Sequence, residues 1–349
     1  MKKNILIGNR HIHEDAPAYI IAEMSANHLM DYDRAKEIIR LVKEAGADAI
    51  KLQTYTADTI TIDCDTEPFR LEGGLWDGET LYSLYQKAYT PWEWQQGLFD
   101  YAKELGIDCF SSPFDLTAVD FMEQIGMPAY KVASFEINDI PMIRKIAKTG
   151  KPIIISTGAA HMSDIELALR TCEEEQNSNV ILLKCTSAYP SPYEDMNLRT
   201  IPLMGNTFDC ITGLSDHTLG SEVALGAIAL GAKVVEKHVT LKREDGGPDG
   251  AFSMEIEEFA SMIQQIRNLE KALGTATFRL TDNQEEARET MRSLYITEDV
   301  KVGETLTENN VRSIRPNGGL HTKYYEQILG KKARHDLKKG MPLTWDMIE

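Results

Sequence analysis

Two histidines, His217 and His238, stand at the ends of short apolar runs in this sequence. A pair of imidazoles with a carboxylate nearby is a pattern that binds divalent metal ions. The carboxylate beside them, Asp216, would support such a site or cap a helix rather than bind the ion. A purely structural role is the alternative for both rings. We predict a metal site at His217 and His238.

Three lysines, Lys51, Lys131 and Lys184, also lie within apolar runs, where an unpaired charge is costly. Together with nearby serine hydroxyls they would surround one anion that carries a phosphate and a carboxylate. Ion pairing with glutamates is the alternative for each lysine. The serines are Ser112, Ser134, Ser156 and Ser187, and the glutamates are Glu23, Glu136 and Glu236.

Glu23 and Glu136 are the candidate acid and base groups, because each follows an apolar run and a carboxyl can move protons there. A glutamate in such a position can instead be a hydrogen-bonded structural group. Gln53 and Tyr189 stand at comparable positions and add polar contacts.

The pattern that must position these residues is an apolar run, a polar turn and a helical stretch, repeated eight times. Eight such units in roughly 255 residues predict a (β/α)₈ barrel, and a doubly wound sheet is the rival fold. In a barrel, the ends of seven of the eight strands would aim a charged group or a metal ligand at one mouth. The predicted strands are 18–23, 49–54, 108–111, 129–132, 153–156, 180–184, 210–214 and 234–238, and predicted helices include 33–45, 91–105, 163–175, 221–230 and 256–273.

The barrel is predicted to span residues 1–273, with an N-terminal extension at 1–17. Residues 56–90 form a long interval before the next helix, and such βα loops are often lids or specificity elements. A polar linker is predicted at 274–291. Residues 292–349 form a small, mostly β domain, in which the segment 299–311 recurs at 336–348 as an internal duplication.

The formal net charge of −17 excludes a general nucleic-acid binder, which needs a basic face. Residues 291–349 nevertheless hold 10 Lys and Arg against 8 Asp and Glu, so the acidity belongs to the barrel. No apolar run is long enough to span a membrane. Five cysteines without a C-x-x-C pair indicate reduced, buried thiols and a cytoplasmic protein.

Several blocks of this chain resemble the sialic acid synthase family, whose members are phosphoenolpyruvate-dependent nonulosonic acid synthases. The resemblance covers nearly the whole chain in order, and 292–349 is similar to the antifreeze-like (SAF) domain. The matching blocks are IAEMSANH (21–28), AYKVASFE (129–136), ISTG (155–158), YPSPYED (189–195), GLSDHT (213–218), EKH (236–238) and IRPNGG (314–319).

The resemblance implies a (β/α)₈ barrel followed by an SAF domain, and a domain-swapped homodimer. It implies an enzyme that condenses phosphoenolpyruvate with an amino-sugar aldehyde, aided by a divalent ion, Mn²⁺ or Mg²⁺, on His217 and His238. Glu23 and Glu136 would be catalytic or contact the acceptor, Asp249 would bind the sugar, and Arg315 would reach into the partner's site. Around the phosphoenolpyruvate it implies Lys51, Gln53, Ser112, Lys131, Ser134, Ser156, Ser187 and Ser215.

Within that family, the interval 72–94 closely resembles the pseudaminic acid synthases. That likeness implies 2,4-diacetamido-2,4,6-trideoxy-L-altrose as the acceptor, pseudaminic acid as the product, and release of phosphate by C–O cleavage. A neuraminate or legionaminate synthase is the nearest alternative. Two alternatives are more distant: a metal-dependent aldolase that does not consume phosphoenolpyruvate, and a carbohydrate- or ice-binding protein that is not an enzyme.

Overall fold

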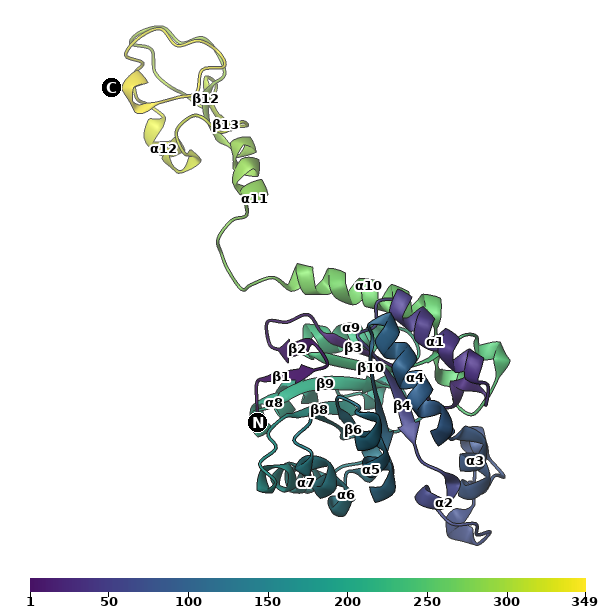
Figure 1. The fold of residues 1–349 in the computed structure, drawn as a ribbon. Coiled ribbons are helices and arrows are strands. Elements are labelled where there is room, and N and C mark those ends of the chain that lie inside the picture. The colour runs from purple at the N-terminus through teal and green to yellow at the C-terminus, as the bar shows by residue number, and fades with distance from the viewer. The chain divides into compact units, whose positions relative to one another are not determined.

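A computed structural model describes residues 1–73 and 75–349 of the chain. It has two compact units, Met1–Gly274 and Thr275–Glu349. The first unit holds the predicted barrel (Figure 1).

The barrel consists of eight parallel strands that close because β10 pairs with both β9 and β3. The prediction of a closed (β/α)₈ barrel is therefore confirmed, and the doubly wound alternative is wrong. A short strand, β11 (Met254–Glu255), pairs with the carboxyl end of β10 at Val239 and Thr240. The barrel strands are β3 (Tyr19–Glu23), β4 (Ala49–Thr54), β5 (Asp108–Pro113), β6 (Tyr130–Val132), β7 (Ile153–Ser156), β8 (Val180–Cys185), β9 (Ile211–Asp216) and β10 (Val234–Thr240).

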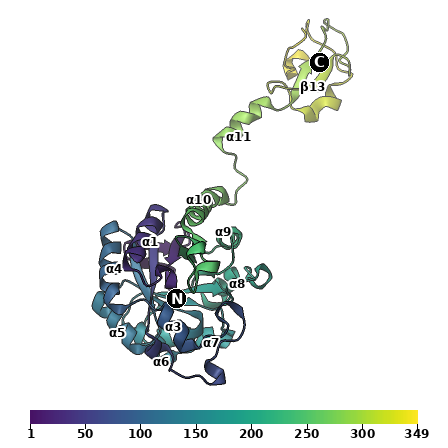
Figure 2. The same ribbon diagram turned by 90° about the vertical axis from the view of Figure 1, so that its right-hand side faces the viewer.

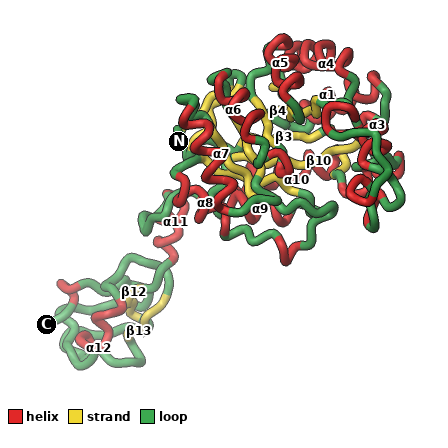
Figure 3. The backbone as a smooth tube through the Cα atoms, turned by 90° about the horizontal axis from the view of Figure 1, so that it is seen from below, coloured by secondary structure: helices red, strands yellow, loops and turns green.

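Helices surround these strands in chain order, as the ring in Figures 2 and 3 shows. Helix α1 illustrates why they form: Asp31 caps its first turn by accepting from two backbone N–H groups, and its apolar face buries Ile38, Ile39 and Val42. The surrounding helices are α1 (Tyr32–Glu44), α4 (Trp92–Leu105), α5 (Leu116–Ile125), α6 (Ile140–Lys148), α7 (Met162–Glu174), α8 (Thr200–Phe208), α9 (Glu222–Ala229) and α10 (Ile256–Leu273).

The N-terminal extension is a hairpin of β1 (Asn4–Ile7) and β2 (Arg10–His13). Its residues Ile5, Ile7 and Ile12 are buried in the same apolar cluster as barrel residues. The extension therefore completes the barrel core, which the sequence pattern did not indicate.

The long interval between β4 and α4 holds two helices, α2 (Ala57–Ile60) and α3 (Leu81–Ala88). We call residues 56–90 the insert. Thr80 caps α3 by accepting from the backbone N–H of Ser83 at 3.1 Å. Cys64 in the insert is half-buried, so the expectation of buried thiols holds only for the other four cysteines.

The second unit contains helices α11 (Asp282–Ala287) and α12 (Tyr325–Ile328) and a two-stranded sheet of β12 (Ser293–Ile296) and β13 (Val311–Ile314). Helix α11 lies within the segment that was expected to be a linker. The duplicated segments make reciprocal contacts: Lys301 bonds Asp336 at 2.8 Å, and Lys338 bonds Asp299 at 2.7 Å. In the part of the chain that the structure describes, no helix is long and apolar enough to cross a membrane.

Candidate active site

A cavity of about 550 Å³ opens at the carboxyl ends of the barrel strands. This is the end of a (β/α)₈ barrel at which catalytic side chains gather. Its lining includes the lysines of β4 and β6, both predicted histidines, and residues of the insert. The cavity is therefore the candidate active site.

At its base, Lys51 lies between two buried carboxylates. Its Nζ is 2.8 Å from Glu23 Oε2 and 3.3 Å from Glu236 Oε1. Glu23 and Lys51 are direct partners in the parallel register of β3 and β4, so the barrel itself brings them together. Lys51 therefore forms the ion pairs that were the alternative to anion binding, and it does so at the predicted anion site.

Lys131 reaches the same base from β6 and is only 1% exposed. Its Nζ donates to Ser156 Oγ at 2.7 Å and lies 3.9 Å from Glu236 Oε1. Ser134 accepts from the backbone N–H of Gly158 at 3.1 Å. A Cβ at Gly158 would lie 2.4 Å from Ser187 Oγ and 2.9 Å from Ser134 Oγ, so glycine leaves room here for both hydroxyls.

The carboxyls around this base divide by charge state. Burial alone would raise the pKa of Glu236, but Lys131 and Lys51 hold it below its ordinary range, so Glu236 stays ionised. Burial raises the pKa of Glu23 to about 7, against the opposing effect of Lys51. Burial likewise raises the pKa of Glu136 to about 7, against Lys131. Two carboxyls whose pKa values lie near 7 can give or take a proton at physiological pH.

His217 and His238 lie on one wall, with ring centroids 5.2 Å apart. His217 Nδ1 is 3.0 Å from the backbone oxygen of Thr186, which can only accept. In the neutral ring Nδ1 therefore carries the proton, and the lone pair of Nε2 is free for a ligand. Burial would lower the pKa of His217, but Cys185 and the Thr186 carbonyl raise it.

His238 is the more clearly neutral ring. Burial and then the charge of His217 lower its pKa well below the ordinary value, and its buried Nδ1 has no hydrogen-bond partner in the described structure. These two rings fit a divalent ion that leaves positions for substrate oxygens and water. Within residues 1–73 and 75–349, no third His, Cys, Asp or Glu completes a three-residue cluster.

Ser25, which follows β3, bonds the loop that follows the neighbouring strand β10. Its Oγ donates to Asp249 Oδ2 at 2.5 Å and accepts from Gln53 Nε2 at 3.0 Å. Its backbone φ of 46° is unusual for a residue with a side chain and marks a constrained position. Gln53 also donates to Glu23 Oε1 at 3.0 Å, so Asp249 joins the network of the cavity base.

Most of the predicted site residues line this cavity, but Lys184 does not. The side chains of Cys185 and Ser187 face inward, so Lys184 points to the other side of β8 because strand side chains alternate. Its Nζ donates to the backbone oxygen of Cys185 and to Thr186 Oγ1. The expectation that three lysines surround one anion is therefore corrected to two. The predicted residues on the lining are Gln53, Lys51, Lys131, Ser134, Glu136, Ser156, Ser187, Tyr189, Ser215, His217, His238 and Asp249.

Ser112 is next to the lining, because it accepts from Lys51 Nζ at 3.3 Å. Arg315 belongs to the second unit, and its contact with the acceptor stays a prediction.

Glu236 was not among the predicted site residues, although it shares the inward face of β10 with His238, two positions later. That alternation was the available signal. Aromatic residues of the lining were also missed, namely Tyr55, Tyr85, Phe114 and Phe135. Tyr189 packs between the site and the insert, with ring centroids 4.4 Å from His217 and 6.0 Å from Trp76.

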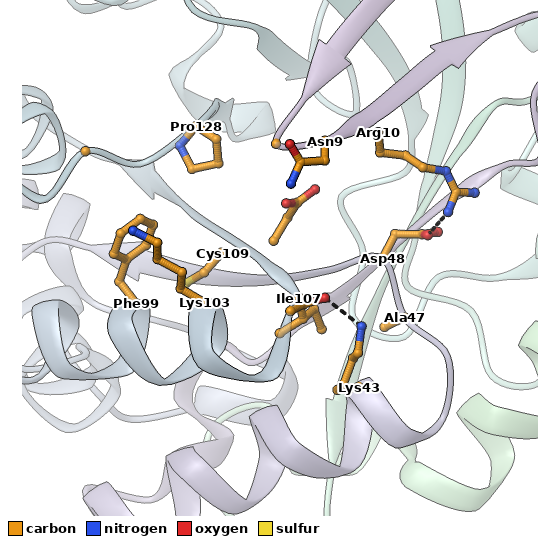
Figure 4. A pocket seen from close by; sticks show the side chains of 14 residues that line it. Asn9, Arg10, Lys43, Ala47, Asp48, Phe99, Lys103, Ile107, Cys109 and Pro128 are labelled. Carbon is orange, nitrogen blue, oxygen red and sulfur yellow. Dashed lines mark hydrogen bonds and ion pairs between the residues drawn. The ribbon is translucent and has the colours of Figure 1, made fainter.

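A second cavity of about 510 Å³ lies at the amino ends of the strands (Figure 4). Arg10 there pairs with Asp48 at 2.5 Å, and Lys43 donates to the backbone oxygen of Gly106 at 2.6 Å. These cations are already engaged by the protein. The carboxyl-end cavity remains the candidate active site.

Comparison with known proteins agrees with this geometry. The family model described as NeuB family matches residues 38–278, and the SAF domain model matches residues 291–349. The chain belongs to the NeuB family. The resemblance stated from the sequence blocks is therefore confirmed.

Three relatives of this chain, from Helicobacter pylori and from two strains of Campylobacter jejuni, are named pseudaminic acid synthase. A protein of Helicobacter pylori named pseudaminic acid synthase is 46% identical over 95% of this chain and 98% of its own length. A protein of Campylobacter jejuni named N,N'-diacetyllegionaminic acid synthase is 36% identical over 92% of this chain and 97% of its own length. Among solved structures, the sialic acid synthetase of Leptospira borgpetersenii has a TM-score of 0.73 at 31% identity, covering 82% of this chain and 95% of that chain.

Proposed function

We propose that this enzyme is a transferase that condenses phosphoenolpyruvate with 2,4-diacetamido-2,4,6-trideoxy-L-altrose to give pseudaminic acid and phosphate. One observation carries the proposal: two buried lysines and two open imidazoles share one cavity at the carboxyl ends of the strands. Relatives at 45–46% identity over nearly the whole chain are named pseudaminic acid synthase.

The cavity base suits phosphoenolpyruvate. Lys51 and Lys131 supply positive charge, and Ser134, Ser156 and Ser187 supply hydroxyl donors for phosphate and carboxylate oxygens. Glu236 already balances part of the lysine charge, so the anion would compete with this carboxylate for the same ammonium groups. Burial strengthens those contacts, because water is excluded from the base.

At the mouth, His217 and His238 would hold the divalent ion, which when bound polarises the aldehyde oxygen of the acceptor as a Lewis acid. Asp249, fixed by Ser25 and by the backbone N–H of Ala26, would accept hydrogen bonds from the sugar. Both contacts would orient the acceptor toward the phosphoenolpyruvate.

The condensation then begins at C3 of phosphoenolpyruvate and ends with the release of phosphate. C3 of phosphoenolpyruvate forms a bond to the aldehyde carbon, whose oxygen takes up a proton, and positive character develops at C2. Glu23 or Glu136, as a carboxylate, stabilises that charge and accepts a proton from the water that adds at C2. The bond between C2 and the bridging oxygen breaks, phosphate leaves with that oxygen, and the keto acid closes to a ring.

The test is incubation of the protein with phosphoenolpyruvate and a panel of amino-sugars, with and without Mn²⁺ or Mg²⁺. Phosphate release with the L-altrose sugar is expected. Release with N-acetylmannosamine or the legionaminate precursor alone would move the function to the alternative synthases. Release that persists in EDTA would contradict the metal role, and ¹⁸O of the bridging position should leave with phosphate.

We also propose a domain-swapped homodimer in the cytoplasm, in which Arg315 of one subunit contacts the acyl group of the acceptor in the other. The match of the SAF domain model supports an antifreeze-like second unit. A guanidinium offers several N–H donors to a carbonyl oxygen.

A further inference from the structure

The insert, residues 56–90, is strongly charged in sequence but apolar toward the cavity. It contains nine charged residues, and in the structure as described none of them lines the cavity. Four of them form ion pairs within the insert: Arg70 with Asp65 at 2.8 Å, and Lys87 with Glu79 at 2.5 Å. The lining residues of the insert are Ile60, Leu71, Trp76, Leu81, Leu84, Tyr85 and Ala88.

Five of these seven side chains contain only carbon and hydrogen. We call Ile60, Leu71, Leu81, Leu84 and Ala88 the apolar wall. Such side chains cannot replace the hydrogen bonds that a hydroxyl group loses on leaving water. They do provide a favourable surface for a methyl group.

The apolar wall and the charged base come from different parts of the chain: the wall belongs to the insert, and the two lysines belong to β4 and β6. Lys51 and Lys131 are 4% and 1% exposed at that base, whereas Leu81 and Tyr85 are half-buried. Tyr85 packs edge-to-face on Tyr55, with ring centroids 5.6 Å apart. An acceptor whose aldehyde meets the histidines can also contact the insert, because both line the same cavity.

We infer that the apolar wall binds the terminal C6 methyl group of the acceptor and so selects 6-deoxy amino-sugars over sugars that carry a primary hydroxyl at C6. This inference rests on the proposed function and names the part of the protein that sets its substrate class. Replacing a methyl by a hydroxymethyl in such a pocket changes kcat/KM by about 10- to 100-fold.

The experiment compares two acceptors that differ only at C6, 2,4-diacetamido-2,4,6-trideoxy-L-altrose and its 6-hydroxy counterpart, with phosphoenolpyruvate and Mn²⁺. The wild type is expected to prefer the deoxy sugar by about 10- to 100-fold in kcat/KM. The variants Leu81→Asn and Leu71→Asn each place an amide in the wall and are expected to reduce that preference about tenfold. The KM for phosphoenolpyruvate should stay unchanged.

The matched control is Leu75→Asn, the same change at an exposed leucine of the insert that is not on the lining. It should keep the wild-type preference. Equal kcat/KM values for the two sugars in the wild type would overturn the inference and leave the proposed function standing, whether or not the variants fold. A preference unchanged in both folded wall variants would overturn it too. Absence of phosphate release with either sugar would overturn the proposed function and this inference together.

Discussion

The two lysines at the cavity base differ in their partners. Lys51 contacts the carboxylates of both Glu23 and Glu236, whereas Lys131 lies at the edge of contact with Glu236 and bonds Ser156. Lys51 is therefore the lysine closest to both buried carboxylates. The same two ammonium groups are the proposed ligands of phosphoenolpyruvate. Because their protein partners differ, substitutions at the two lysines can separate an effect on stability from an effect on binding.

We expect Lys51→Met to destabilise the protein by about 3–5 kcal/mol, because it leaves buried carboxylates without their partner. Lys131→Met should cost less, because Lys51 still pairs with Glu236. Urea unfolding followed by circular dichroism measures both. Calorimetric titration should show about a tenfold or greater loss of phosphoenolpyruvate affinity in Lys131→Met. Lys184→Met is the control, and an equal loss there would contradict the placement of Lys184 outside the cavity.

Glu136 makes stability depend on pH. Burial raises its pKa in the folded protein to about 7, from an ordinary value of 4.5. Between these two values the folded state binds more protons than the unfolded state, so the free energy of unfolding falls as pH rises from about 4.5 to about 7. Glu136→Gln should flatten that fall, although Glu23 contributes in the same direction.

The measurement for Glu136→Gln is urea unfolding at several pH values, without metal or substrate. Glu257→Gln, which changes an exposed glutamate of α10, should keep the wild-type slope. If the free energy of unfolding falls with pH equally steeply in Glu136→Gln and in the wild type, the raised pKa of Glu136 is contradicted.

At the scale of elements, the insert is attached to the loop that carries Asp249. Trp76 Nε1 donates to the backbone oxygen of Pro248 at 3.1 Å, and its ring lies beside Tyr189. Because Asp249 is the next residue after Pro248, this bond holds the backbone beside Asp249, the residue proposed to bind the sugar. Trp76 is therefore a positioning residue.

We expect Trp76→Phe to raise the KM for the acceptor about fivefold, because the ring is kept but a hydrogen bond of about 1 kcal/mol is lost. The KM for phosphoenolpyruvate should not change. Steady-state kinetics with each substrate varied in turn give both values. Tyr82→Phe is the matched control, since it removes a hydrogen bond to Asp58 at 3.0 Å within the insert but away from the cavity. Similar effects of both variants would contradict the positioning role.

At the scale of the whole molecule, the chain has two units with separate apolar cores. The duplication within the second unit is visible in sequence, and the structure shows what it produces: each copy's aspartate bonds the other copy's lysine. The proposed dimer would bring Arg315 of that unit to the partner's barrel.

Mixing two inactive variants tests the swapped dimer. If Arg315 acts across the dimer, a mixture of Arg315→Ala and His217→Ala subunits forms hybrids with one complete site. After exchange of subunits at equal amounts, about a quarter of the wild-type activity is expected to return, because half of the dimers are hybrid. Each variant alone should stay inactive. A mixture that remains inactive despite mass-spectrometric evidence of hybrids would contradict the role of Arg315 in the partner's site.

The sequence by itself determined the eight strands and the duplicated unit, because apolar periodicity and repeats are local patterns. It favoured a closed barrel, but the pairing of β10 with β3 that closes the sheet joins distant segments and is seen only in the structure. Strand predictions such as 49–54 and 153–156 coincide with β4 and β7. The tertiary structure decided which side chains share the cavity. Lys184 turns outward, Glu236 turns inward, and the insert presents its apolar side, because these directions depend on strand register and on contacts between segments distant in the chain.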